Sequence, residues 1–505
     1  MTPTIKEVSF VVDEQIWGHR LYDEQLPHLA VLEFFNVLQS NQASPLREPT
    51  QGRVRYRPQH QVRLRNILFN NPYIEVVRAS TGSDEAKWTR WVELFREDAT
   101  DPPDRYVGEL KHSFTSFDDF ARAVELLRTS AFEGQSNKRW SSRFVFPFGP
   151  AALYEDLRFD ASGNSSNDRR FFARTGELLY MMLSRAARGP QLGDELVRRM
   201  FQTDSQMNRL VASLQGPPHL ADKEKEVGYL PLASAPRFDR LCDDWLAVLS
   251  RDMPLYDGLD HLITITGLNL LLYFLEQART AIGADEPVEL LCEIVSKHRT
   301  KVRALSIAGF QTNQGMSVRA IEALIQRFKT TPAWLEALAS EDPTGNCAAL
   351  VREHFQYEKD DDVPLTNMAP NELLGRLLER ALTRHEQHVG RIHGTWSRAL
   401  GLSSRRLSRR LRYAPSDRLL KALVVTVVDD TMEYSQFLAE IYRRYGIVVG
   451  HLEGARYIES HQVDQAALMD NAAHLETRLL GLGLVRRLSD SCAFVENPFT
   501  RRGAQ

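Results

Sequence analysis

The chain has 505 residues, of which 43% are hydrophobic and 26% are charged, and its formal net charge is -3. This length exceeds what one hydrophobic core supports, so we expect two to four domains, and the composition excludes a chain that is disordered throughout. Because the net charge is small, no overall field draws the protein to nucleic acid or to an anionic membrane, and any such binding must come from a local patch.

Cysteine usage and the N-terminus indicate where the protein works. The four cysteines stand singly, which favours neither a zinc site nor disulfides. The N-terminus lacks the basic region, apolar core and cleavage site of a secretory signal. The longest apolar stretch, residues 262–274, contains three polar residues and is too short to span a bilayer. We therefore expect a cytoplasmic protein, and the excess of Arg over Lys suggests a bacterial source.

The first 150 residues mix the periods of strands and helices, which predicts an α+β domain over residues 1–150. Alternating apolar residues predict strands, and apolar residues three and four apart predict helices. The expected strands are residues 7–12, 61–68 and 73–78, and the expected helices are residues 26–39, 84–95 and 116–128. The basic and aromatic stretch 138–148 that closes this region is typical of a buried strand, although its rings and cations would also suit base stacking.

Residues 151–400 predict a helical domain, because Leu and Ala recur at helical spacing between Gly and Pro breaks. The run 262–278 is apolar on most faces. Such a helix is expected at the centre of a bundle, where it has a structural role.

Residues 401–505 show the clearest pattern. Amphipathic helices are predicted over residues 416–428, 433–445 and 464–482, and two short strands separated by a Ser-Asp-Ser turn follow. Three helices and a terminal ribbon, joined by the segment LGLVRRLSD, resemble a winged-helix domain. The fold class that we predict is therefore mainly α, with an α+β N-terminal domain, a helical middle and a C-terminal winged-helix-like module.

The resemblance implies a nucleic-acid contact through the third helix, the wing and the basic segment that precedes the module. The candidate residues are Asn471, His474 and Arg478 on the helix, Arg486 and Arg487 on the wing, and Arg405, Arg406, Arg409, Arg410 and Arg412 in the segment SSRRLSRRLRYAP. Two features oppose base reading: acidic residues lie on or near the third helix, and about twenty residues separate it from the second. Docking of a protein partner remains the alternative.

Three charged residues match the sequence pattern of a magnesium-dependent nuclease. Asp104 followed by Glu109 and Lys111 matches the PD-(D/E)xK pattern, in which carboxylates hold Mg²⁺ and a lysine lies beside the attacking water. The two parts of that pattern are usually on adjacent strands and further apart in sequence. Ordinary surface charges therefore explain these residues better, and a cryptic nuclease is the weaker alternative.

Other catalytic or metal motifs are weak. His385, His388 and His393 have side chains that can bind a metal, but no neighbouring Cys or Asp completes a set. The sequence contains no phosphate loop of the Walker type and no GxSxG elbow, which disfavours ATPases, kinases and serine hydrolases. We expect no cofactor and no bound metal, and the sequence favours a protein that is not an enzyme.

Two segments resemble proteins of bacterial antiphage defence clusters linked to DNA modification, by methylation or by phosphorothioation. They are RRFFARTGELLYMMLSRAARG at residues 169–189 and LETRLLGLGLVRRLSDSCAFVENPF at residues 475–499. The resemblance implies a component that works with partner ATPases, nucleases or methyltransferases. Together with the basic segment, it predicts a noncatalytic, nucleic-acid-associated subunit of a defence or DNA-processing complex, with a protein-docking scaffold as the alternative.

Overall fold

A computed structural model describes most of the chain and forms two compact units, each of which gathers segments distant in the sequence. Unit 1 comprises Met1–Pro27, Arg185–Arg188 and Tyr229–Gln505, and unit 2 comprises His28–Ser184 and Gly189–Gly228. The described residues are 8–21, 25–47, 52–61, 63–69, 71–99, 102–129, 149–153, 155–159, 165–167, 173–202, 205–216, 219–220, 223–294, 300–360, 363–489 and 492–499. The basic and aromatic stretch 138–148 lies outside them.

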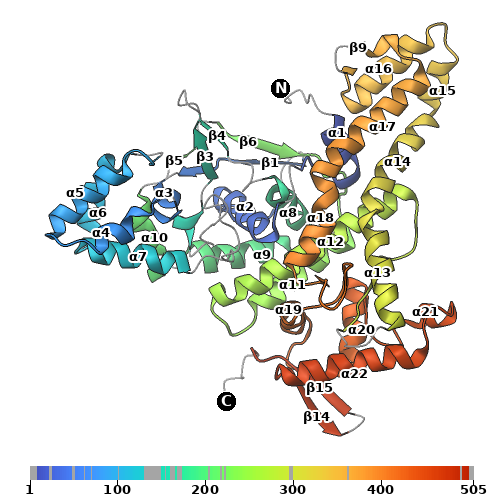
Figure 1. The fold of residues 1–505 in the computed structure, drawn as a ribbon. Helices are drawn as coiled ribbons and strands as arrows, with labels where there is room; N and C mark the ends of the chain where they lie inside the picture. Colours follow the sequence, from blue (N-terminus) through green and yellow to red (C-terminus); the bar gives the residue numbers. More distant parts are fainter. Residues whose placement is uncertain are drawn as a thin grey trace. The chain divides into compact units, whose positions relative to one another are not determined.

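Unit 1 is built around the long helix α12 (Leu255–Ile282), which is buried on most faces. Helices from both ends of the chain pack on α12 (Figure 1): α1 (Val8–Trp17), α11 (Pro236–Leu249), α14 (Met316–Lys329), α18 (Ile392–Ala399) and α19 (Asp417–Val427). Helix α12 is long and apolar enough to cross a membrane, but 89% of its apolar window is buried inside the structure. The prediction of a central bundle helix at residues 262–278 is confirmed.

Four further helices of unit 1 continue from this bundle: α13 (Lys301–Gln314), α15 (Pro332–Leu338), α16 (Pro343–Phe355) and α17 (Pro370–Gln387). Helix α17 packs on α1, α14 and α16. Helix α13 packs on α14 and on the strand β11 (Arg412–Tyr413).

The C-terminal part of unit 1 combines helices with a small antiparallel sheet. After α19, the elements are β12 (Thr431–Glu433), α20 (Tyr434–Tyr445), β13 (Ile447–Val448), α21 (Ala455–Glu459), α22 (Gln465–Gly481), β14 (Val485–Ser489) and β15 (Cys492–Glu496). Strand β15 lies between β12 and β14, and both pairings are antiparallel. Strand β13 instead pairs in parallel with β7 (Leu290–Leu291). The predicted helices at 416–428, 433–445 and 464–482 correspond to α19, α20 and α22.

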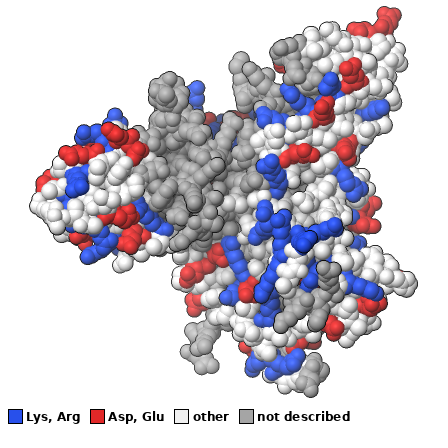
Figure 2. Space-filling model, viewed as in Figure 1, with Lys and Arg blue, Asp and Glu red and all other residues white. Residues whose placement is uncertain are grey.

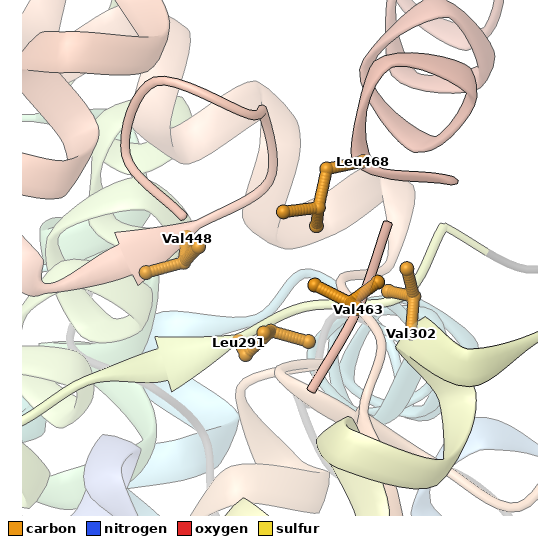
Figure 3. Packing of buried hydrophobic residues seen from close by; sticks show 5 residues of the cluster. All are labelled: Leu291, Val302, Val448, Val463 and Leu468. Carbon is orange, nitrogen blue, oxygen red and sulfur yellow. The ribbon is translucent and has the colours of Figure 1, made fainter. Parts of the chain in front are cut away.

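A cluster of buried aliphatic side chains holds β7, β13, α13 and α22 together (Figure 3). Leu291 and Val448 are neighbours on the paired strands, and Val302, Val463 and Leu468 pack against them. All five are at most 2% exposed. The cluster therefore packs α22 against β7, β13 and α13.

Unit 2 is also mainly helical. Its helices are α2 (Pro27–Ser40), α3 (Arg63–Phe69), α4 (Tyr73–Arg78), α5 (Asp84–Phe95), α6 (Val107–Ser113), α7 (Phe117–Thr129), α8 (Thr175–Ser184), α9 (Gly189–Leu196) and α10 (Gln206–Gln215). Its strands are β1 (Arg53–Tyr56), β2 (Gln59–Gln61), β3 (Glu155–Phe159), β4 (Ser165–Asn167), β5 (His219–Leu220) and β6 (Lys225–Gly228), in two sheets ordered β1-β6 and β4-β3-β2-β5.

The prediction of a mainly α protein is confirmed, but the three strands expected near the N-terminus are wrong. Residues 8–12 belong to α1, residues 63–68 to α3 and residues 73–78 to α4. In α3 the buried apolar side chains among the described residues are Leu64, Ile67 and Leu68, and in α4 they are Ile74 and Val77. Residues three or four positions apart lie on one face of a helix. Over segments this short, the same apolar residues also fit the alternation of a strand, so the pattern does not distinguish a helix from a strand.

The helix predicted at residues 116–128 is confirmed as α7, and Ser116 caps its start. The Ser116 hydroxyl accepts a hydrogen bond from the Asp119 N–H at 3.2 Å. Asp118 and Asp119 lie in the first turn, where negative charge stabilises a helix.

The buried cluster predicts a clear difference between two leucines of α22. Leu468→Ala should lower the free energy of unfolding of unit 1 by about 2–5 kcal/mol, because it leaves a cavity among five buried side chains. Leu480→Ala, at a position that is 48% exposed, should change it by less than about 0.5 kcal/mol. Urea unfolding followed by circular dichroism measures both, and equal losses would contradict the packing.

Candidate functional site

The arginine-rich segment forms a loop closed by two short strands. Strand β10 (Ser403–Ser404) pairs antiparallel with β11, so the residues between them protrude as a hairpin loop. Two serine hydroxyls order the loop: Ser404 accepts the Arg406 N–H at 3.0 Å, and Ser408 accepts the Arg410 N–H at 3.1 Å. We call residues 405–410 the arginine loop.

The arginine loop carries four exposed cations that form no ion pair with another residue in the described part of the chain. These are Arg405, Arg406, Arg409 and Arg410. Between them, Leu407 is 59% exposed and has a φ of 59°, in the left-handed region that bulky side chains rarely adopt. The loop thus holds an uncompensated positive charge in a constrained backbone, an arrangement found at functional sites.

A buried carboxylate anchors the base of the loop. Glu293 is 1% exposed and receives hydrogen bonds from two guanidinium groups: Arg303 at 2.8 Å and Arg412, which is fully buried. Arg412 also donates to the Arg406 carbonyl oxygen at 2.8 Å, which fixes the loop backbone from below. Arg412, a candidate for nucleic-acid contact, therefore has a structural role beneath the surface.

A groove of about 1030 Å³ lies beside the arginine loop. Its walls come from the end of α18, from β10 and the loop, from the start of α19 and from α22. The lining residues are Ile294, Arg398, Ala399, Gly401, Ser403, Ser404, Arg406, Leu407, Ala414, Pro415, Ser416, Asp417, Arg418, His474, Thr477, Arg478 and Leu482. Four arginines and one histidine thus face a single carboxylate. Figure 2 shows Lys and Arg gathered over the middle of unit 1, where Figure 1 draws α18 and the loop ahead of α19.

Two of the groove arginines are held by exposed ion pairs. Arg478 pairs with Asp417 at 2.7 Å, and Arg418 pairs with Asp260 at 2.6 Å. Pairs this accessible to water contribute at most about 1 kcal/mol each, so a stronger anion can displace the carboxylate. Arg398 and Arg406 form no ion pair among the described residues, and both are exposed, which makes them the cations in the lining that are most available to an anionic ligand.

The start of α19 adds a second source of positive potential to the groove. Ser416 caps this helix, and its hydroxyl accepts the Leu419 N–H at 3.5 Å. The preceding loop passes very close, since a Cβ on Gly401 would lie 1.9 Å from the Ser416 hydroxyl oxygen, and Gly401 has a φ of 74°. Only glycine fits this position. The helix dipole at such an N-terminus favours anions.

The other predicted contact residues divide between the groove and the core. His474 and Arg478 line the groove, but Asn471 is buried. The Asn471 amide accepts the Ile294 N–H at 2.8 Å and donates to the carbonyl oxygens of Cys292 and Val449 at 2.9 and 3.0 Å. Asn471 therefore joins three segments of unit 1 and presents no polar atom to a ligand.

The two predicted wing cations are exposed but already paired. Arg486 contacts Glu496 at 2.6 Å across the β14–β15 ribbon, and Arg487 contacts Glu476 of α22 at 2.8 Å. Their net positive field is consequently weaker than that of the arginine loop.

The nuclease candidates do not converge. Glu109 and Lys111 lie in helix α6, two residues apart, so their side chains point to different sides of the helix. Glu109 pairs with Arg63 at 2.6 Å, Lys111 with Glu85 at 2.5 Å and Asp104 with Arg96 at 2.6 Å. Each of the three thus has its own surface partner.

The histidines of the predicted metal pattern also have separate surroundings. The His385 ring lies between Asp13 and Ser317, whereas the Nε2 atom of His393 is 2.8 Å from the Tyr413 hydroxyl. In the described part of the chain, no three His, Cys, Asp or Glu side chains come together as a metal site.

Arg398 and Arg418 are lining residues that the sequence did not single out. Each belongs to an ordinary amphipathic helix, and only the folded contact between α18, α19 and the loop brings them to one groove. No local pattern marks them.

Residues 397–496 match the protein family described as methylation-associated defense system protein MAD7. No curated protein and no solved structure matches the chain. The family match confirms the predicted resemblance to defence-cluster proteins linked to DNA methylation, and it supports the assignment of the chain to an antiphage defence system. The matched residues include both the arginine loop and the groove-lining part of α22.

The buried carboxylate predicts a large loss of stability on neutralisation. Glu293→Gln should lower the free energy of unfolding by about 3–5 kcal/mol, because two guanidinium groups then lack a counter-charge in the interior. Glu496→Gln, which breaks the exposed pair with Arg486, should cost no more than about 1 kcal/mol. Denaturant unfolding of both variants measures these losses. A loss for Glu293→Gln as small as that for Glu496→Gln would contradict a buried contact of Glu293 with Arg303 and Arg412.

His393 predicts a specific pH dependence. Burial lowers its pKa to about 3, whereas a histidine in the unfolded chain has a pKa near 6.5. Between these values the unfolded chain binds a proton that the folded chain does not, so stability falls as pH drops below 6.5, by about 1.4 kcal/mol per pH unit. Between pH 6.5 and 5, the free energy of unfolding should fall by up to about 2 kcal/mol less in His393→Gln than in the wild type. His474→Gln, at an exposed histidine, should behave like the wild type, and parallel curves for all three proteins would refute the prediction.

Proposed function

We propose that the chain is a nucleic-acid-associated subunit of an antiphage defence complex, and that the arginine loop and its groove contact the phosphate backbone. The observation that carries this proposal is the set of four exposed, unpaired arginines in residues 405–410, beside a groove lined by four arginines and one carboxylate. Guanidinium groups match phosphate oxygens in geometry and charge. A locally positive surface on a chain of net charge -3 is the local patch that such binding requires.

The C-terminal module is, in this proposal, a winged helix. Its support is the order of elements, in which the strand β12 follows the first helix, and α22 leads into the ribbon β14–β15 with β15 in the middle of the sheet. The segment between α20 and α22 departs from a compact helix-turn-helix, because it contains β13 and α21 and pairs with β7.

Contact with the backbone is favoured over reading of bases. A recognition helix reads base edges with polar side chains of the exposed face, and most often with arginine. None of the exposed residues of α22 is Lys or Arg; they are Gln465, Ala466, Met469, Asp470, Ala473, His474, Thr477, Leu480 and Gly481. The one arginine of this helix, Arg478, is only partly exposed and is paired with Asp417. The positive charge therefore lies in the loop and groove, which suits a position-fixing contact that is independent of base sequence.

The groove would act by binding. Guanidinium groups remain protonated in proteins, so they stabilise a phosphate but do not serve as a general base or nucleophile at neutral pH. Partner components would then carry out the chemistry of the system, in the cytoplasm, where the complex meets DNA.

Docking of a protein partner is a second candidate, and one observation favours it. Met469 and Leu480 on α22 are 50% and 48% exposed, and Leu488 on β14 is 59% exposed. Exposed apolar side chains are typical of contact surfaces. Another component of the defence system is the partner that this candidate implies.

Binding of the full chain to duplex DNA tests the first proposal. The wild type should bind with an affinity that falls steeply with salt, because bound arginines release counterions from DNA. Arg405→Ala/Arg406→Ala should weaken binding by roughly tenfold or more and reduce the slope of log K against log salt by about 2. Fluorescence anisotropy over a range of salt concentrations measures both quantities.

A second adjacent arginine pair provides the matched control. Arg486→Ala/Arg487→Ala removes the same number of charges, but from arginines already paired with carboxylates, and should change the slope much less. Equal effects of the two double variants would contradict a contact centred on the loop. If the wild type does not bind at low salt, while a partner protein co-purifies through nuclease treatment and high salt, the docking candidate replaces the first.

A further inference from the structure

Three side chains from distant segments of unit 1 form a continuous hydrogen-bonded chain. The Asp13 carboxylate is 3.1 Å from Nδ1 of His385, and the Ser317 hydroxyl is 2.9 Å from Nε2 of the same ring. An ionised carboxylate only accepts hydrogen bonds, so Nδ1–H donates to Asp13 and Nε2 is left to accept the Ser317 hydroxyl proton. This is the arrangement of carboxylate, imidazole and serine that makes a hydroxyl nucleophilic.

The packing of three helices holds the arrangement in place. Asp13 lies on α1, Ser317 at the start of α14 and His385 near the end of α17, and each of these helices packs against the other two. Trp17, one turn after Asp13, stacks on the imidazole with ring centroids 5.4 Å apart and planes at 10°. The Trp17 indole N–H donates to the Phe274 carbonyl oxygen at 3.1 Å, which fixes the ring that supports the imidazole.

Ser317 is the least buried of the three residues. His385 is fully buried and Asp13 is 2% exposed, whereas Ser317 is partly exposed. The carboxylate and imidazole therefore lie beneath the serine, and Ser317 is the member that solvent reaches. An activated nucleophile needs this order, with a reactive atom at the surface and its base and orienting group below.

Ser317 also stands where backbone N–H groups are available. It is the second residue of α14, and the helix is entered from Gly315, whose carbonyl oxygen accepts the Arg319 N–H at 3.4 Å. The N–H groups of Met316, Ser317 and Val318 precede that first bond of the helix, and the first N–H groups of a helix have no partner within it. Such groups can donate to negative charge that develops beside the serine, but the α14 dipole is offset there by the C-terminus of α13, which ends at Gln314.

We propose that Ser317 is a catalytic nucleophile for acyl transfer from carboxylic esters, with His385 as general base and Asp13 as the positioning residue for the imidazole. The Ser317 oxygen forms a bond to the carbonyl carbon while its proton passes to Nε2 of His385. The carbon–oxygen bond to the leaving alcohol then breaks, and that alcohol takes the proton from Nε2. Water repeats the sequence on the acyl-serine and releases the carboxylic acid, so the enzyme is regenerated without an oxidant or a metal.

The site is independent of the arginine loop, since it uses none of the groove residues. A purely structural network of the same three residues would also hold α1, α14 and α17 together. The two roles differ in a measurable way: only the catalytic one makes the Ser317 hydroxyl react faster than other serines with an electrophile.

A fluorophosphonate probe tests the proposal on the full chain. Attack by the serine oxygen on phosphorus displaces fluoride, and the serine proton leaves with it, so intact-mass and peptide mass spectrometry report the labelled residue. We expect one adduct, on Ser317, in the folded wild type, and none in Ser317→Ala. His385→Gln should slow labelling by about 10²–10⁴-fold, the usual contribution of a general base. Asp13→Asn should slow it as well, because Nδ1 then lacks the carboxylate that sets the tautomer.

Two controls separate reactivity from folding. Ser83 also stands at a helix start, where its hydroxyl accepts the Ala86 N–H at 3.3 Å, so it should remain unlabelled and Ser83→Ala should label at the wild-type rate. Circular dichroism and thermal midpoints identify any variant that fails to fold. Labelling of the wild type tests the proposal even where a variant does not fold. Absence of a Ser317 adduct in the folded wild type overturns the proposal. A folded His385→Gln protein that labels at the wild-type rate overturns it too.

Discussion

The C-terminal part of unit 1 depends on one buried carboxylate, that of Glu293. A carboxylate in the interior is costly unless cations and hydrogen bonds compensate it, and here two guanidinium groups do so. The backbone around Glu293 then joins the other elements: its N–H donates to the Tyr413 carbonyl oxygen at 2.9 Å, and the Cys292 N–H donates to that of Val448 at 2.9 Å. The loop, β13 and α22 are therefore all tied to one short segment.

This anchoring explains how the arginine loop can hold four like charges. Unpaired cations close together repel one another, and a flexible loop would relax that repulsion by spreading. Arg412 prevents this, since it is fixed by Glu293 and holds the loop backbone through the Arg406 carbonyl oxygen. The energy of a buried ion network is thus used to keep the surface charges in one place. A ligand with phosphate groups would meet them already positioned, which reduces the entropy lost on binding.

Local periodicity predicted the helices α19, α20 and α22, because each contains enough turns to show one apolar face. It failed for α1, α3 and α4, whose few buried residues fit two periods. The groove was predicted only in part: His474, Arg478 and Arg406 stood out by type, whereas Arg398 and Arg418 become neighbours only through folding. Arg412 and Asn471 were predicted as nucleic-acid contacts but are buried. The sequence does not show whether a polar side chain binds a ligand or other parts of the same chain. Asp13, Ser317 and His385 carry no shared motif, and a triad is defined by geometry and not by sequence order.

The groove and the serine site rest on different physical properties, so each can be judged without the other. Guanidinium groups keep their charge across the whole physiological range, and contacts between them and phosphate weaken with salt. The serine site depends instead on the hydrogen bond between Asp13 and His385, which burial shields from added ions, while Ser317 is partly exposed. Salt should therefore act on the groove and leave the contact between Asp13 and His385 nearly unaffected. A chain with both sites would combine a contact that holds it on a charged polymer with a separate reactive hydroxyl.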